Sequence, residues 1–151
     1  MDEIVARSLA KWPNVPAVYG WLELDRRGNW LIKGERIGNA ALREFIGRNY
    51  EADERGRWFF QNGPQRVYVK LAYTPLVVHY EGESLVDQCG RPFGQQKAYQ
   101  DEEGSVLLEG ERGIALLDDR DLGRFADSAA ELGRIRRSEI ERRFGFISDP
   151  S

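Results

Sequence analysis

The sequence is poor in the two residues that most often build metal and redox sites, with one cysteine and one histidine in 151 residues. Because Cys89 stands alone, an internal disulfide is excluded and a reducing compartment is favoured. Because His79 stands alone, a histidine-based zinc or iron site is disfavoured, since such sites recruit several ligands. We therefore expect neither a metal nor a cofactor.

Long apolar runs and an excess of positive charge are also absent. No run approaches the roughly 18–20 residues of a membrane span, and the acidic start Met1-Asp2-Glu3 does not have the pattern of a signal peptide. A formal net charge of −3 disfavours non-specific nucleic-acid binding, which needs a basic surface. We expect a cytoplasmic protein whose partner is an unknown small molecule or protein, with no membrane partner. A homodimer stays open.

What the sequence does contain is one short spacing, Asp-x-x-Gly, in four copies. The copies begin at Asp25, Asp53, Asp87 and Asp101. Aspartate at the first position of a type I turn bonds the backbone two residues on, and glycine at the fourth tolerates a positive φ. Such a turn joins two strands as a hairpin with a bulge. The spacing predicts repeated β-hairpins, with positive φ at Gly28, Gly56 and Gly104, and it specifies no reaction.

Apolar periodicity predicts the remaining elements. Helices are expected from Asp2 to Trp12, from Asn39 to Tyr50, from Asp118 or Asp119 to Gly133, and after a capping box at Ser138. Strands are expected at 19–24, 29–33, 58–60, 66–71, 76–80, 84–86, 96–100, 105–108 and 113–117. These elements predict an α+β fold of antiparallel β-hairpins in two pseudo-repeated, strand-rich lobes with packed helices. We expect one domain over 1–151, with lobes at 17–80 and 81–120 and C-terminal helices within 119–145.

Several of these motifs occur together in a known family. They are Gly28-Asn29-Trp30, Gly34-Glu35-Arg36-Ile37, Asp53-Glu54-Arg55-Gly56-Arg57-Trp58, Val67-Tyr68-Val69 and Thr74-Pro75-Leu76-Val77-Val78. In this pattern the chain resembles a family of small bacterial proteins of unknown function, closely over residues 20–80 and loosely over 81–120. The resemblance implies an α+β fold and a role in signalling or ligand sensing. It supplies no catalytic residues.

No group of residues in the sequence forms a coherent catalytic motif. His79 lacks the G-x-S-x-G elbow of a hydrolase, and Cys89 lacks a C-x-x-C companion. The first hypothesis is therefore a non-enzymatic regulatory or ligand-sensing module in bacterial signalling. One alternative is an enzyme with a carboxylate and histidine site that the sequence does not resolve. The other is a nucleic-acid-associated factor that uses the C-terminal arginines.

The alternating strand from residue 66 to residue 71 predicts a ligand-binding face. Its apolar residues should enter the core, because alternation leaves one apolar face. The opposite face then carries Arg66, Tyr68 and Lys70, and Tyr73 and His79 join it if the next strand pairs alongside. Cations, aromatic hydroxyls and an imidazole suit an anionic or polar ligand.

Overall fold

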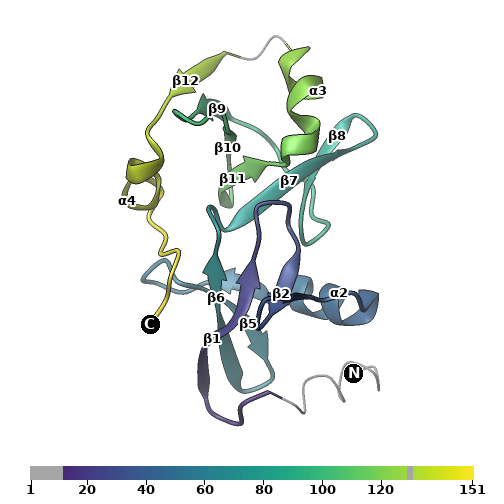
Figure 1. The fold of residues 1–151 in the computed structure, drawn as a ribbon, viewed down its shortest axis with the longest axis vertical. Coiled ribbons are helices and arrows are strands. Elements are labelled where there is room, and N and C mark those ends of the chain that lie inside the picture. The colour runs from purple at the N-terminus through teal and green to yellow at the C-terminus, as the bar shows by residue number, and fades with distance from the viewer. Residues whose placement is uncertain (1–11, 129–130) are drawn as a thin grey trace.

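The computed structural model describes residues 12–128 and 131–151 and contains two six-stranded sheets, one above the other in Figure 1. Short helices lie at the periphery of these sheets. The fold is therefore α+β with two pseudo-repeated lobes, as the sequence predicts. The helix expected from Asp2 lies outside the described residues. No described helix is long and apolar enough to cross a membrane.

The first sheet is built from residues 17–71. Its elements are β1 (Ala17–Leu24), β2 (Trp30–Ile32), β3 (Glu35–Arg36), α2 (Ala40–Arg48), β4 (Tyr50–Ala52), β5 (Trp58–Asn62) and β6 (Gln65–Leu71). The strand order is β3-β2-β1-β6-β5-β4, and β1 pairs parallel to β6. The first and last long strands of the lobe therefore lie side by side at its centre. Helix α2 begins after Asn39, whose side chain accepts a hydrogen bond from the Leu42 N–H, as predicted.

The second sheet repeats this plan. Its strands are β7 (Leu76–Glu81), β8 (Ser84–Asp87), β9 (Lys97–Gln100), β10 (Val106–Gly110), β11 (Gly113–Leu117) and β12 (Leu132–Arg134). They lie in the order β12-β9-β10-β11-β7-β8, and β7 pairs parallel to β11 as β1 does to β6. The change of sheet falls in the connector of residues 72–75. Strand β7 therefore belongs to the second lobe, although the sequence placed the boundary after residue 80.

The four Asp-x-x-Gly segments adopt one and the same turn. In each, the aspartate Oδ1 accepts hydrogen bonds from the backbone N–H groups two and four residues on, at 2.8–3.0 Å. The fourth-position glycines have φ between +80° and +87°. Side chains with a Cβ rarely adopt this conformation, because Cβ then crowds the carbonyl oxygen. The positive φ predicted for Gly28, Gly56 and Gly104 is confirmed.

The region after residue 117 differs from the prediction. The short elements η1 (Asp119–Asp121) and α3 (Leu122–Ala126) replace the long helix, and residues 132–134 form β12 beside β9. Gly133 allows this pairing because it packs against the Tyr99 ring, which would lie only 3.1 Å from a Cβ. The expected capping box is also absent. Ser138 lies inside η2 (Arg137–Glu139), and α4 (Ile140–Phe144) begins without a side-chain cap.

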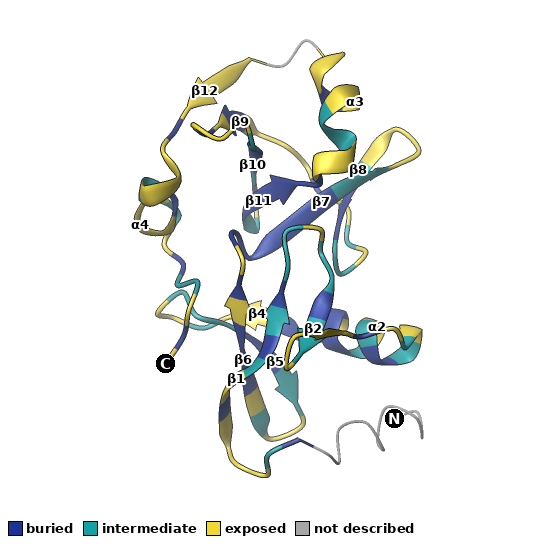
Figure 2. Ribbon diagram, in the orientation of Figure 1, coloured by how far each residue is buried: buried dark blue, intermediate teal, exposed yellow. Residues whose placement is uncertain are grey.

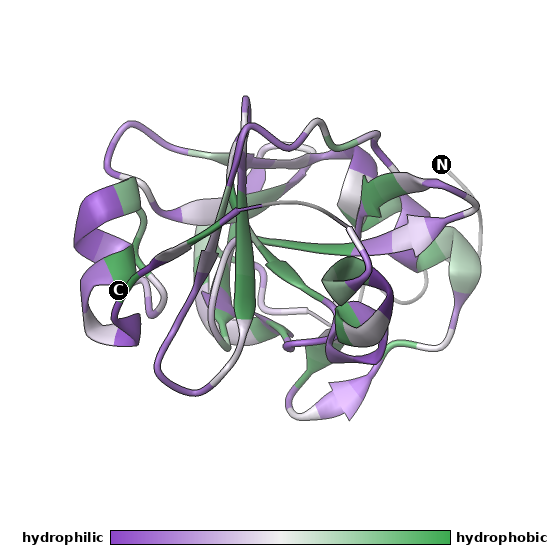
Figure 3. Ribbon diagram, turned by 90° about the horizontal axis from the view of Figure 1, so that it is seen from above, coloured by the Kyte–Doolittle hydropathy of each residue, from purple (hydrophilic) through white to green (hydrophobic). Residues whose placement is uncertain are grey.

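One hydrophobic cluster contains residues of both sheets, and Figures 2 and 3 show buried, apolar positions concentrated on the central strands. The predicted core face of β6 is confirmed, since Val67, Val69 and Leu71 are buried. Residues 135–148, here called the strap, lead from β12 back to the first lobe (Figure 1). There the Ile147 N–H donates to the Gly56 carbonyl at 2.9 Å. The Leu71 N–H donates to the Ser148 carbonyl at 2.7 Å.

Candidate ligand pocket between the lobes

A cavity of about 500 Å³ lies where the two lobes meet. The first Asp-x-x-Gly turn, the connector, β11 and the start of α3 line it. Its apolar wall consists of Leu116, Leu117 and Leu122, and the first two of these are buried in the core. Arg26, Arg27, Ser105 and Asp119 supply the polar part. The cavity thus joins an apolar wall to a few polar groups, the usual composition of a small-molecule site.

Two arginines line this cavity, and Arg26 is the one that has no carboxylate partner among the described residues. Its Nη2 donates to the Ser105 Oγ at 2.8 Å, and its guanidinium carbon lies 5.1 Å from the centre of the Tyr73 ring. Within residues 12–128 and 131–151, no carboxylate oxygen lies within 4.0 Å of its nitrogens. Two neutral groups therefore hold Arg26 in place and leave its charge uncompensated.

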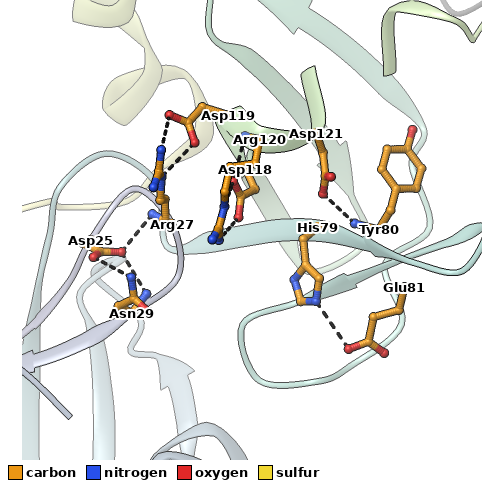
Figure 4. A network of polar contacts seen from close by, with 10 residues as sticks. All are labelled: Asp25, Arg27, Asn29, His79, Tyr80, Glu81, Asp118, Asp119, Arg120 and Asp121. Carbon is orange, nitrogen blue, oxygen red and sulfur yellow. Dashed lines mark hydrogen bonds and ion pairs between the residues drawn. The ribbon is translucent and has the colours of Figure 1, made fainter. Parts of the chain in front are cut away.

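Arg27 also lines the cavity, but it has a carboxylate partner. Its Nε and Nη2 donate to the two oxygens of Asp119 at 2.9 and 3.2 Å, as Figure 4 shows. The hydrogen bond with Asp119 raises the pKa of Arg27 above its ordinary value. Both side chains are at least half exposed, so solvent screens the pair and its contribution to stability is small. The pair links the first turn of one lobe to η1 of the other.

The remaining acids of the 118–121 segment have structural roles (Figure 4). Asp118 is buried and caps η1, and its carboxylate accepts hydrogen bonds from the Arg120 backbone and side chain. Burial alone would raise the pKa of Asp118, but the hydrogen bonds from Arg120 outweigh it and lower the pKa. Asp121 accepts a hydrogen bond from the Tyr80 N–H at 2.9 Å. Asp118 thus caps the short η1, in the place where the sequence predicts the start of a long helix.

On β6, other side chains cover part of the face that the sequence predicts to bind a ligand. Tyr68 is 4% exposed because Tyr19 stacks on its ring, with centroids 4.8 Å apart, and the Arg57 guanidinium lies 4.6 Å from it. Arg66 lies 4.3 Å from the Phe59 ring. Arg66 and Lys70 are exposed. Ligand binding at this face stays a prediction, which titration of an Arg66→Ala Lys70→Ala variant would test.

Tyr73 and His79 do not join that face, because β7 pairs in the other sheet. Tyr73 is buried in the connector, and its hydroxyl donates to Asp101 Oδ2 at 2.7 Å. Burial and this hydrogen bond raise the pKa of Tyr73 far above its ordinary value. His79 lies on β7 with its Nε2 3.4 Å from Glu81 Oε1, and it lines a separate cavity of about 400 Å³.

Cys89 also lines that second cavity, and its surroundings disfavour the thiolate form. The residue lies at the third position of the Asp87 turn, against the backbone of Gly47. Burial raises the pKa of Cys89 to about 12. Since the thiolate is the nucleophile, a pKa this high leaves almost none of the reactive form at neutral pH. Across the part of the chain that the structure describes, no group of three or more His, Cys, Asp and Glu residues is placed to hold a metal ion.

Sequence reasoning missed the pocket because its residues come from distant segments. One local signal was available. Positions two and three of the four turns are Arg-Arg, Glu-Arg, Gln-Cys and Glu-Glu in chain order, so only the first turn carries two cations. That signal indicates Arg26 and Arg27 but not Ser105 or Asp119, which the fold brings to them.

The site and the fold define a two-lobed α+β protein with an interlobe pocket. The sequence matches over residues 1–151 a family described as "Protein of unknown function (DUF2946)", and the chain belongs to that family. The resemblance to proteins of unknown function is thereby confirmed. No curated protein matches the sequence.

Two solved structures have a similar fold. A DUF1285 family protein from Silicibacter pomeroyi DSS-3 has a TM-score of 0.58 and 17% identity, over 84% of each chain. A DUF1285 family protein from Shewanella baltica OS155 has a TM-score of 0.52 and 16% identity, over 70% of this chain and 90% of that one. At these identities the similarity shows the fold alone.

Proposed function

We propose that this protein is a non-enzymatic regulatory module that senses a small molecule in the pocket between its lobes. The observation that carries the proposal is the cavity of about 500 Å³ with an apolar leucine wall and an uncompensated arginine. Its volume lies within the roughly 300–1,000 Å³ typical of small-molecule sites. A role in bacterial signalling belongs to the same proposal.

The position of the pocket suits a sensor. Its walls come from both lobes, and the Arg27–Asp119 pair is one of the contacts that bridge them. A ligand that contacts both walls binds one arrangement of the lobes better than others, and such differential binding shifts the population of arrangements. A binding event would thus change the relation between two sheets without any chemical step.

Other observations support binding over the two alternatives. For a carboxylate and histidine enzyme, the side chains of His79 and its neighbour Glu81 are 40% and 67% exposed, and neither lines the interlobe pocket. Among the C-terminal arginines, Arg137 pairs with Glu103 at 3.2 Å, and Arg143 lies 4.9 Å from the Tyr99 ring. These contacts engage two of the cations that a nucleic-acid surface would need.

A thermal-shift screen tests the proposal, because a ligand that binds the native state raises the unfolding midpoint. The informative variant is Leu122→Phe, which adds bulk to the pocket wall. Its matched control is Leu132→Phe on β12, which is exposed and not part of the cavity.

We expect metabolites that raise the midpoint of the wild type and of Leu132→Phe, with a smaller rise for Leu122→Phe. Unchanged binding by Leu122→Phe, or no midpoint shift with any metabolite, would overturn the assignment.

A further inference from the structure

We propose that the ligand of this pocket is an organic anion, whose acidic group binds Arg26 and whose apolar body lies against the leucines. The inference rests on the proposed function, because it concerns the same cavity.

The charge at Arg26 gives the first step. Neighbouring guanidinium groups already have carboxylate partners, as Arg27 has Asp119 and Arg120 has Asp118. In the described part of the chain, Arg26 has one hydrogen-bonding partner, the neutral Ser105 hydroxyl. A guanidinium carries five N–H donors in a fork that matches a carboxylate or phosphate. An acidic group would therefore find unused N–H donors on Arg26.

The acids of the pocket also favour an anionic ligand, because each of them already accepts hydrogen bonds from the protein. Asp25 accepts hydrogen bonds from the Arg27 and Asn29 N–H groups and from the Asn29 side-chain amide, at 2.8–2.9 Å. Asp119 offers both of its oxygens to Arg27. These hydrogen bonds offset part of the negative charge that would attract a cationic ligand, whereas Arg26 has no carboxylate partner among the described residues. We therefore expect the pocket to favour an anion over a cation.

Arg26 is also held in position before any ligand arrives. The Tyr73 ring lies on one side of its guanidinium at 5.1 Å, and the Ser105 hydroxyl holds one end at 2.8 Å. Tyr73 is itself fixed by Asp101 and has the Arg137 guanidinium 4.8 Å from its ring. A side chain that is already ordered loses less conformational entropy on binding, which favours affinity.

The apolar wall gives the second step. Leu116, Leu117 and Leu122 present hydrocarbon surface to the same cavity. Burying a methylene group favours binding by roughly fourfold per group. The ligand that uses both halves of the site is therefore an acid with an apolar chain or ring, rather than a bare inorganic anion.

Straight-chain carboxylates from acetate to octanoate are direct probes of this inference. Each is titrated by calorimetry and compared with the alcohol and the alkylammonium ion of equal length. We expect carboxylates to bind more tightly as the chain lengthens, until the cavity is full, and ammonium ions not to bind. Carboxylates that bind no better than the alcohols of equal length would overturn the anion assignment.

Two variants assign the charge to one residue. Arg26→Gln keeps an amide donor near Ser105 but removes the charge, and we expect it to weaken octanoate binding tenfold or more. Arg55→Gln removes an exposed arginine from the second Asp-x-x-Gly turn and should leave binding unchanged. Equal octanoate affinity in Arg26→Gln and the wild type would overturn the role of Arg26.

A further measurement needs no substitution. The Nε–H resonance of Arg26, followed by NMR during an octanoate titration, should shift more than that of Arg55. An unmoved Arg26 resonance under saturating octanoate would overturn the inference even if Arg26→Gln does not fold. Binding of alcohols or ammonium ions alone contradicts the anion inference and leaves the sensor proposal standing. Failure of these probes and of the metabolite screen contradicts both.

Discussion

The Asp53 turn and the Asp101 turn occupy the same place in the two lobes, one joining β4 to β5 and the other β9 to β10. Their backbones make the same hydrogen bonds, and their glycines have φ of +81° and +87°. Their surroundings differ. Gly56 lies against the strap, whereas a Cβ on Gly104 would meet no atom within 4 Å.

The carboxylates of the two turns differ in the same way. Asp53 Oδ2 accepts from Arg57 Nε at 2.8 Å, and the Tyr68 hydroxyl lies 3.3 Å from it. Asp101 Oδ2 accepts from the buried hydroxyl of Tyr73. The Asp-x-x-Gly spacing therefore encodes the turn, while the rest of the chain decides what the turn holds in place.

Replacing the glycine of each turn by alanine should give the largest difference in stability between the two turns. Both Gly56→Ala and Gly104→Ala force a Cβ into a left-handed conformation, which costs about 1–2 kcal/mol. Only Gly56→Ala also places a Cβ onto the Gly145 carbonyl oxygen. Displacing that backbone adds roughly 1–3 kcal/mol. Urea unfolding should show Gly56→Ala to be the less stable variant, and equal losses would contradict the packing described for the strap.

Removing the tyrosine hydroxyl that contacts each aspartate should give a smaller difference in stability between the two turns. Tyr73→Phe leaves a carboxylate oxygen of buried Asp101 without its donor, and an unsatisfied buried group costs about 1–3 kcal/mol. Tyr68→Phe should cost less, because Arg57 still binds the same oxygen of Asp53 at 2.8 Å. Chemical denaturation of both variants measures the difference. A larger loss for Tyr68→Phe would reverse the expected ranking.

The ionisation of Asp53 should change the free energy of unfolding by a still smaller amount. Burial raises the pKa of Asp53, but hydrogen bonds from the backbone of Arg57 and Arg55 and from the Arg57 side chain outweigh it, so the pKa is lowered. A lowered pKa in the folded state stabilises the protein above the unfolded pKa of about 3.9. That stability is lost as the pH falls through the folded value.

Asp53→Asn tests this pH dependence. The variant should be less stable than the wild type at pH 7. The difference in their free energies of unfolding should become smaller as the pH falls below about 4. Denaturant midpoints across that range give the measurement. Glu54→Gln, which removes an exposed negative charge from the same turn, is the control and should show no such narrowing. A gap that is constant with pH would contradict the lowered pKa.

Replacing Cys89, in the Asp87 turn, should have the smallest effect on the free energy of unfolding. Cys89→Ser conserves shape and should change the free energy of unfolding by less than roughly 1 kcal/mol. Because burial raises the pKa of the thiol, a thiol reagent such as dithionitrobenzoate should react slowly with the native protein and quickly after unfolding. Fast reaction of the native protein would show that this turn opens.

Local sequence rules predicted the features that depend on local chemistry. The aspartate and glycine of each turn satisfy their hydrogen bonds and φ within five residues, so the turns and the strands beside them were predictable. Asn39 likewise caps α2 through a neighbour three residues away. The core face of β6 followed from strict alternation.

The rest depends on contacts between distant segments. Gly133 would end a helix by local rules, yet it lies in β12 because it fits against the Tyr99 ring of β9. The lobe boundary was placed too late because nothing local shows that β7 pairs with β11. Arg26 meets Ser105 only through the docking of one lobe on the other, so the pocket was beyond the reach of a local pattern.

The strap is synthesised after the strands of both sheets, so the first lobe is made without it. The first sheet has all its strands once Leu71 is made, but the carbonyl that its N–H binds belongs to Ser148. At about 5–20 residues per second, a ribosome needs roughly 4–15 seconds to synthesise the chain from Leu71 to Ser148. During that time the Gly56 carbonyl and the Leu71 N–H are without the strap, and the nascent first lobe exposes them to any chain nearby.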